Sequence, residues 1–342
     1  MADFISSFGP PKRHQPWRRR LQDFALNGGI WLALLLFGGL SLAGTRRLAR
    51  CLVFLSRPFL GSSSRIIEAN LKLAFPDKSA AEIAALRHRN LCFMIELACD
   101  FLQSLKHPHR IEQRLLPVIV PAEYPPDQPL LFCLPHLGNW EILARMIPRT
   151  GRRCAAVTGV FRSRKLNELM TRGRSACGIE LIPNVGAAVK VRAAIQDRKS
   201  VGLLIDQNIS PKHGGVFVNF FSLPAPTSRL PASIALQLHV PVLAGACIKQ
   251  DDGNFALLLQ PLPKPAWEYS DVNTLTEAIL EANAQLIRQH PEQYLWIYRR
   301  WRYLPANLTP ELRQRFPFYA CNNKYACPQE LLETPLKDCS HD

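Results

Sequence analysis

Short apolar runs alternate with amphipathic stretches through the central part of the chain. The runs have the length of buried strands, and the stretches between them place apolar residues at helical spacing. We therefore predict an α/β fold with a mostly parallel sheet and covering helices. The predicted strands are Leu130–Leu134, Cys154–Val157, Glu180–Ile182, Val201–Ile205, Val216–Phe220, Val240–Ile248 and Phe255–Leu259, and the predicted helices lie near 139–147, 164–177, 186–197, 229–238 and 273–290.

The longest uncharged stretch lies near the amino terminus, at residues 24–44. It is long enough to cross a hydrocarbon layer of ~30 Å, so the fold class includes one N-terminal membrane-anchoring helix ahead of the sheet. Basic residues flank it on both sides and give no clean orientation, so a shallow helix within one leaflet also fits. A cleaved signal peptide and a buried core helix are the weaker alternatives.

The remaining segments divide the chain around one large domain. Ser79 and Glu82 have the spacing of a capping box and predict the start of a helix ahead of the sheet. Prolines between residues 117 and 129 mark a linker. We predict a basic segment at 1–23, the membrane helix at 24–44, the main domain at 45–310 and a loosely ordered tail at 311–342.

Charge and cysteine content restrict the partners and the compartment. The 342 residues include 42 Lys and Arg against 27 Asp and Glu, a formal net charge of +15 that favours anionic partners. No zinc-finger spacing or RNA-recognition motif is present, so we expect a membrane or an acidic protein and no nucleic acid. The ten cysteines are scattered, as in a reducing compartment. Cys321, Cys327 and Cys339 match no zinc pattern, and we predict no metal site.

One pair of ionisable residues follows the first predicted strand. His136 and Glu141 belong to the sequence Pro-His-Leu-Gly-Asn-Trp-Glu that begins directly after Leu134. Five residues apart on an unbroken helix, they would point roughly 140° away from each other. They can meet only if His136 lies in a turn, which Pro135 and Gly138 favour. Glu141 would then accept the Nδ1 proton of His136 and leave Nε2 free to act as a base.

The pair resembles a serine triad without its serine. The chain has no G-x-S-x-G elbow, and no cysteine stands beside a histidine in the sequence, so a covalent acyl-enzyme has little support. The substrate's own hydroxyl would be the nucleophile. Taken alone, a His and a Glu at this spacing also fit an unrelated surface or core pair, and they make only half of a zinc site.

Several ordered blocks resemble one known family. The sequence from His136 to Glu141 is similar to the H-x-x-N-W-E signature of the late acyltransferases of lipid A biosynthesis, a branch of the lysophospholipid acyltransferase superfamily. Further similar blocks contain Arg162 with Arg172 and Arg174, Asp206 with Phe217, and the closing segment 291–302. The resemblance covers about residues 25–303.

The resemblance implies an enzyme that moves a fatty acyl chain from acyl carrier protein to a hydroxyl of a Kdo-lipid A precursor. The main domain would be an acyltransferase domain facing the cytoplasm at the bacterial inner membrane, acting in lipopolysaccharide biosynthesis without a cofactor. An acidic carrier and an anionic lipid acceptor both suit the net positive charge. His136 and Glu141 would be catalytic, and the implied substrate-binding residues are Asn139, Arg162, Arg172, Arg174, Asp206 and Phe217.

Two departures leave the acceptor open. Tyr298 stands where the closing block usually has His, and Asn208 stands where an acidic residue often follows Asp-Gln. The same chemistry on a lysoglycerophospholipid, a mannosylated inositol lipid or a polyketide-like alcohol is therefore an alternative. A membrane scaffold without catalysis is an alternative of another class, which the intact His136 and Glu141 disfavour.

Overall fold

The computed structural model describes residues 28, 39–56, 61–159, 164–306 and 308–321. Most of the predicted membrane helix at 24–44 lies outside these residues, and its last three residues begin the helix α3 (Leu42–Ser56). Among the described helices, none combines the length and the apolar character needed to span a bilayer.

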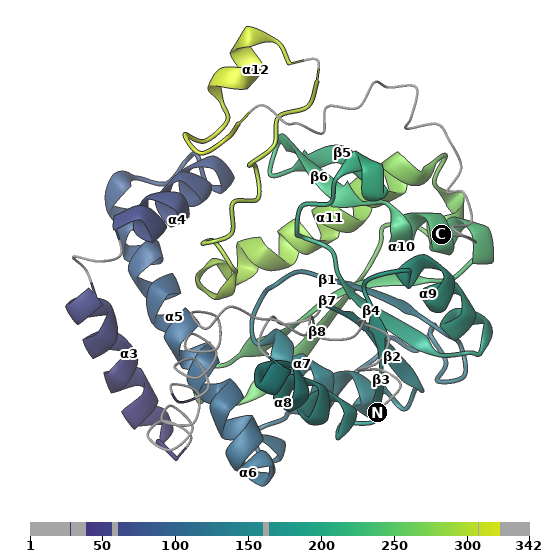
Figure 1. The fold of residues 1–342 in the computed structure, drawn as a ribbon, viewed down its shortest axis with the longest axis horizontal. Coiled ribbons are helices and arrows are strands. Elements are labelled where there is room, and N and C mark those ends of the chain that lie inside the picture. Colours follow the sequence, from purple (N-terminus) through teal and green to yellow (C-terminus); the bar gives the residue numbers. More distant parts are fainter. Residues whose placement is uncertain (1–27, 29–38, 57–60, 160–163, 307, 322–342) are drawn as a thin grey trace, which may run out of the picture.

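A six-stranded sheet forms the centre of the domain (Figure 1). Its strand order is β3-β2-β4-β1-β7-β8, and all neighbours are parallel except the antiparallel edge pair β7 and β8. This confirms the predicted α/β class with a mostly parallel sheet. The strands are β1 (Leu131–Leu134), β2 (Cys154–Thr158), β3 (Ile179–Pro183), β4 (Ser200–Leu204), β7 (Val242–Lys249) and β8 (Phe255–Pro261).

Helices pack on both faces of this sheet (Figure 1). One apolar cluster joins α6 and α7 to one face, and a larger cluster joins α9, α10 and α11 to the other. These residues form helices because their apolar positions recur on one side, and all of these helices except α6 were predicted from the sequence. The helices are α6 (Pro108–Glu112), α7 (Trp140–Met146), α8 (Arg164–Ser175), α9 (Ala187–Gln196), α10 (Leu230–Leu238) and α11 (Val272–Gln289), with short 3₁₀ turns at Ile147–Thr150, Pro211–His213, Ala266–Glu268 and Pro291–Gln293.

Two further helices precede the sheet and brace one side of it. These are α4 (Gly61–Ala74) and the long α5 (Ala80–Lys106). The predicted capping box is confirmed, because the Ser79 side chain accepts from the Glu82 amide while the Glu82 carboxylate accepts from the Ser79 amide at 2.8 Å. Lys249 on β7 is almost fully buried and donates to Glu96 and Asp100, which ties α5 to the sheet.

A two-stranded antiparallel hairpin stands apart from the sheet. Its strands are β5 (Gly215–Phe220) and β6 (Leu223–Ser228). The sequence predicted the first strand but not the second, because two prolines in Leu-Pro-Ala-Pro-Thr-Ser argue against a strand. Both prolines are tolerated here, since β6 pairs with β5 on one side only.

The last described residues pack onto the domain. The helix α12 (Pro310–Gln314) precedes Tyr319, which is buried and donates its hydroxyl to the Asn70 side chain. Residues 310–321 are therefore attached to α4, whereas 322–342, with Cys327 and Cys339, lie outside the described residues.

Candidate active site

His136 and Asp206 meet at the carboxyl edge of the sheet because their strands are adjacent. β1 and β4 are parallel, with Leu134 opposite Leu204, so the second residue beyond each strand reaches the same place. His136 Nδ1 lies 2.6 Å from Asp206 Oδ1, and the His136 amide donates to Asp206 Oδ2 at 2.8 Å. One carboxylate thus fixes both the backbone and the ring of His136.

The turn that carries His136 requires a glycine. Gly138 has φ +65°, and a Cβ atom there would come within 2.0 Å of the Cys247 carbonyl oxygen. The turn is held to its neighbours by three backbone hydrogen bonds: Gly138 donates to Gln293 at 3.0 Å, Asn139 to Cys247 at 2.7 Å, and Leu295 to His136 at 3.1 Å. The backbone around the imidazole is therefore tightly positioned, as a catalytic base requires.

The two groups have the pKa shifts of an ion pair. Burial alone would lower the pKa of His136, but the charge of Asp206, the hydrogen bond to it and the charge of Glu141 raise it above the ordinary value of 6.5. Burial raises the pKa of Asp206, but the charge and hydrogen bonds of His136 and the charge of Arg300 bring it below 3.8. Asp206 therefore stays ionised, holds the proton on Nδ1 and makes Nε2 the free nitrogen.

A buried guanidinium lies behind this pair. Arg300 is 1 % exposed and donates to Asn208 Oδ1 at 2.9 Å, to the Pro226 carbonyl at 2.8 Å and to the Thr227 hydroxyl. Burial lowers the pKa of Arg300, and the charge of Asp206 opposes that change. Arg300 thus supplies a positive charge that favours the ionised form of Asp206.

The predicted contact between His136 and Glu141 is wrong. Glu141 receives a bidentate pair of hydrogen bonds from Arg174, with Nη2 to Oε1 at 2.8 Å and Nε to Oε2 at 3.1 Å. Arg174 also donates to the Thr158 hydroxyl. Glu141 lies in the first turn of α7 and Arg174 in the last turn of α8, where helix dipoles favour their charges. Glu141 still acts on His136 electrostatically, but Asp206 takes its predicted place at Nδ1.

The other predicted binding residues have separate positions. Asn139 is buried and caps α7, because its Oδ1 accepts from the Glu141 and Ile142 amides at 3.2 and 3.1 Å. Arg172 is exposed on α8, and Phe217 is half-buried on β5, whereas Arg162 lies outside the described residues. The Arg174 guanidinium is already paired with the Glu141 carboxylate. The roles of these residues in substrate binding stay predictions.

Among the described residues, the Gln207 side chain is the hydrogen-bonding neighbour of His136 Nε2. The His136 side chain is 12 % exposed, its Nε2 lies 3.4 Å from the Gln207 side-chain nitrogen, and the Trp140 ring packs edge-on with centroids 5.1 Å apart. A neutral imidazole in this arrangement can accept a proton from a substrate hydroxyl. Among the described residues, no group of three or more His, Cys, Asp and Glu could hold a metal ion.

Three cysteines of the described residues, Cys92, Cys133 and Cys247, are not activated nucleophiles. Contrary to the sequence expectation, one of them does lie near a histidine, since Cys92 Sγ is 3.8 Å from His88 Nε2 on the next turn of α5. Burial raises the pKa of Cys92, as it does for Cys133 and Cys247 near the sheet. These thiols therefore stay protonated, whereas a nucleophilic cysteine requires a lowered pKa.

The structural partner of His136 has a signal in the sequence. Asp206 directly follows the predicted strand Val201–Ile205, His136 closely follows the predicted strand Leu130–Leu134, and the carboxyl ends of parallel strands share one edge. The order of the strands along the chain does not show which strands are neighbours. In the sheet β4 lies beside β1, although β2 and β3 come between them in the sequence. Tyr294 and Arg300, which lie near Asp206, had no such signal.

Comparisons with known proteins give a family match and similar relatives. The family model of bacterial lipid A biosynthesis acyltransferases matches residues 18–303. Phosphatidylinositol mannoside acyltransferases of two Mycobacterium tuberculosis strains are 23 % identical over 175 residues, which is 50 % of this chain and 54 % of theirs. The chain thus spans about half the length of the curated relatives it matches.

Proposed function

Because the chain belongs to the bacterial lipid A biosynthesis acyltransferase family, we propose that it transfers a fatty acyl group from acyl carrier protein to a hydroxyl of a Kdo-lipid A precursor. The observation that carries this proposal is the partly exposed His136 imidazole, whose Nδ1 is held by Asp206 at 2.6 Å. That arrangement suits direct transfer to a substrate hydroxyl. The family match and the name of the mycobacterial relatives support acyl transfer as the reaction class.

The proposed mechanism uses one base and no covalent acyl-enzyme. His136 Nε2 takes the proton of the acceptor hydroxyl as that oxygen attacks the thioester carbonyl carbon of the donor. The tetrahedral intermediate then expels the carrier thiolate, which receives the proton from Nε2. Asp206 remains ionised throughout and stabilises the transient imidazolium through its charge and its hydrogen bond. Glu141 adds a second negative charge nearby and positions the turn through Arg174.

The charge of the chain supports anionic partners in this reaction. Acyl carrier protein and a phosphorylated lipid acceptor are both acidic, and a net charge of +15 attracts both. We also propose that residues 24–44 attach the protein to the inner membrane, with the acyltransferase domain on the cytoplasmic side, since this stretch carries no charged residue.

The direct test is a transfer assay with the purified full-length protein. Acyl carrier proteins loaded with different chain lengths are mixed with a Kdo-lipid A precursor, and the products are weighed by mass spectrometry. We expect one added acyl ester per acceptor with the wild type and at least ~100-fold slower transfer with His136→Ala, as for the loss of a positioned base. Equal product formation by both proteins would refute His136 as the base.

A mannosylated inositol lipid is a second candidate acceptor. The observation in its favour is the similarity to phosphatidylinositol mannoside acyltransferases, together with Tyr298 and Asn208 at two positions that depart from the lipid A pattern. Asn208 donates to the Arg299 carbonyl at 3.0 Å, and its amide donates to the Tyr298 hydroxyl at 2.9 Å, so the two departures form one unit. Offering both acceptors at equal concentration in the same assay distinguishes the candidates.

A further inference from the structure

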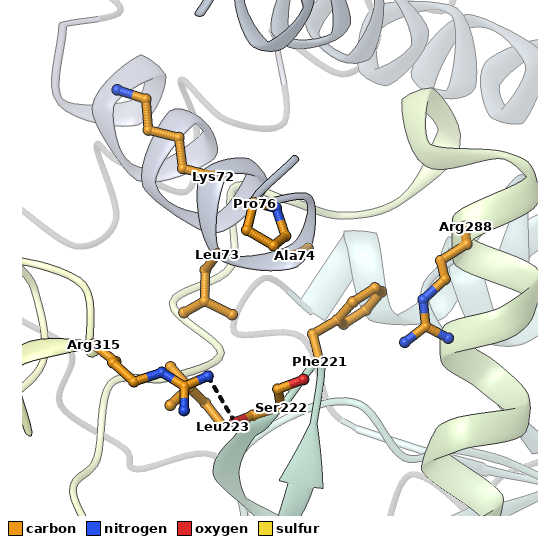
Figure 2. A pocket seen from close by; sticks show the side chains of 9 residues that line it. All are labelled: Lys72, Leu73, Ala74, Pro76, Phe221, Ser222, Leu223, Arg288 and Arg315. Atoms are coloured by element: carbon orange, nitrogen blue, oxygen red, sulfur yellow. Dashed lines mark hydrogen bonds between the residues drawn. The ribbon is translucent and has the colours of Figure 1, made fainter. Parts of the chain in front are cut away.

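A cavity lies on the side of the molecule where α4, the β5–β6 hairpin, α11 and the segment after α12 come together (Figures 1 and 2). Its volume is about 270 Å³. Neither His136 nor Asp206 lines it. The aromatic ring of Phe221 packs against the rings of Phe220 and Trp296, and Phe221 also forms one wall of the cavity.

Two arginines converge on this cavity from different elements. Figure 2 shows Arg288 of α11 and Arg315 approaching the Phe221–Ser222 turn from opposite sides, while the Lys72 ammonium points away. Arg315 makes only a long hydrogen bond of 3.5 Å to the Ser222 carbonyl and contacts no carboxylate of a described residue. Arg288 lies over the Phe221 ring at 4.9 Å and donates to Glu281 at 2.7 Å. No acidic side chain lines the cavity.

The walls between the arginines are mostly apolar. Leu73 comes from the end of α4, Pro76 from the turn after it, and Phe221 and Leu223 from the hairpin. Phe221 and Ser222 both have positive φ, +49° and +66°, a backbone conformation that is unfavourable for residues other than glycine. The turn that presents Phe221 to the cavity is therefore maintained at a conformational cost.

We propose that this cavity binds the phosphate head group of an anionic phospholipid, with the phosphate at Arg315, the positive charge of Arg288 on the other side of the Phe221–Ser222 turn, and the glycerol carbons against Phe221 and Leu73. A guanidinium fork matches phosphate geometry, and a phosphate ester with attached carbon atoms suits a cationic rim above an apolar wall. The carboxyl end of α4 carries a partial negative charge that opposes an anion, and Glu281 offsets part of the charge of Arg288. Arg315 contributes a positive charge that is paired with no carboxylate of the described residues.

The size of the cavity favours a head group over an acyl chain. A water occupies about 30 Å³ of liquid, so the cavity has the volume of roughly nine waters. Pockets for larger ligands begin at about 300 Å³. The exposed positions of Arg288, Arg315 and Ser222 let the hydrocarbon chains remain outside. Because the cavity contains no reacting group, this inference does not depend on the proposed acyl transfer.

The test measures binding by the full-length protein in a neutral detergent. Isothermal titration calorimetry is run with dihexanoyl phosphatidylglycerol, dihexanoyl phosphatidylcholine and inorganic phosphate. We expect phosphatidylglycerol to bind most tightly and Arg315→Gln to weaken that binding about tenfold, since a hydrogen bond to a charged group contributes about 1.5 kcal/mol or more. Arg288→Gln combined with Arg315→Gln should remove measurable binding.

Two controls make the result specific. Arg313→Gln removes the same charge two residues away, outside the cavity, and should bind phosphatidylglycerol as the wild type does. His136→Ala should also bind normally, which separates this site from the catalytic one. The proposal fails if Arg315→Gln binds like Arg313→Gln, if phosphatidylcholine binds as tightly as phosphatidylglycerol, or if inorganic phosphate alone binds as tightly as the lipid.

Discussion

Replacing Asp206 with Asn should distinguish the role of Asp206 from that of Glu141, the other carboxylate near His136. In the wild type, Oδ1 faces Nδ1 of His136 at 2.6 Å and Oδ2 accepts from the His136 amide at 2.8 Å. The asparagine can satisfy only one of these contacts. If its oxygen accepts from the amide, its NH₂ group faces Nδ1 and moves the ring proton to Nε2, so the nitrogen that should accept the substrate proton already carries one.

The opposite orientation of the asparagine also has a cost. If its oxygen faces Nδ1, the His136 amide loses its acceptor, and an unsatisfied buried donor costs ~1 to 3 kcal/mol. Either orientation removes the negative charge beside the imidazole. We therefore expect kcat/KM for Asp206→Asn to fall ~10²- to 10⁴-fold, the range for a positioned general base.

The pH profile gives the second measurement. Wild-type kcat/KM should decrease on the acidic side with an apparent pKa above 6.5, because His136 must be neutral to accept a proton and its pKa is raised. Asp206→Asn should move this limb to lower pH, because the wild-type Asp206 carboxylate favours the imidazolium and the variant lacks it. The same change should lower the plateau value of kcat/KM. Glu141→Gln is the control and should move the limb less. A larger shift with Glu141→Gln than with Asp206→Asn would refute the assignment of Asp206.

Further predictions concern stability and attachment. The His136–Asp206 pair should stabilise the fold most between pH 4 and 6.5. The contribution of Asp206 is lost as pH falls through its lowered pKa, and the contribution of His136 is lost as pH rises through its raised pKa. The difference in Tm between the wild type and Asp206→Asn should therefore be largest in this pH range. Arg174→Ala should lower both Tm and activity, with partial recovery in Arg174→Lys, because it leaves the Glu141 carboxylate without its partner; a normal Tm with reduced activity would instead support a binding role. Gly138→Ala should lower Tm by about 5 °C or more, since strain and overlap with the Cys247 carbonyl together cost roughly 3 kcal/mol, and an unchanged Tm would contradict the geometry of the turn. Deleting residues 24–44 should release the protein from sedimented membranes, whereas a deletion variant that still sediments would place the attachment elsewhere.

Much of the fold was predictable because its signals are local. The strands before His136 and Asp206 and the capping box at Ser79 depend on neighbouring residues, and the structure confirms them. The strand β6 was missed because its prolines oppose strand formation in most contexts, and only its position in a two-stranded ribbon makes them acceptable. The order of the strands, by contrast, depends on packing that no single segment encodes.

The site shows the same division between local and distant signals. His136 was found from its place after a strand. Spacing along the chain could not show whether Glu141 or Asp206 is the partner of its Nδ1. Asp206 is 70 residues away, and only the pairing of β1 with β4 brings it to the imidazole. Arg300, which is 1 % exposed behind Asp206, lies among Arg299 and Arg302 in the sequence, and nothing local distinguishes it from them.

The two acids near His136 have different structural tasks, and this explains the five-residue spacing in the motif. His136 belongs to the turn and is fixed by a carboxylate from the sheet, whereas Glu141 belongs to the first turn of α7 and is fixed by Arg174 of α8. Gly138 and the Asn139 cap lie among the four residues that connect these two units. A change at Glu141 should therefore act on catalysis in two ways, through the charge it contributes near the imidazole and through the position of α7. Glu141→Gln removes the charge and keeps the size of the side chain, and Glu141→Ala removes both. If the position of α7 matters more than the charge of Glu141, Glu141→Gln should retain more activity than Glu141→Ala. Arg174→Ala, which leaves the Glu141 charge in place, should then also reduce activity.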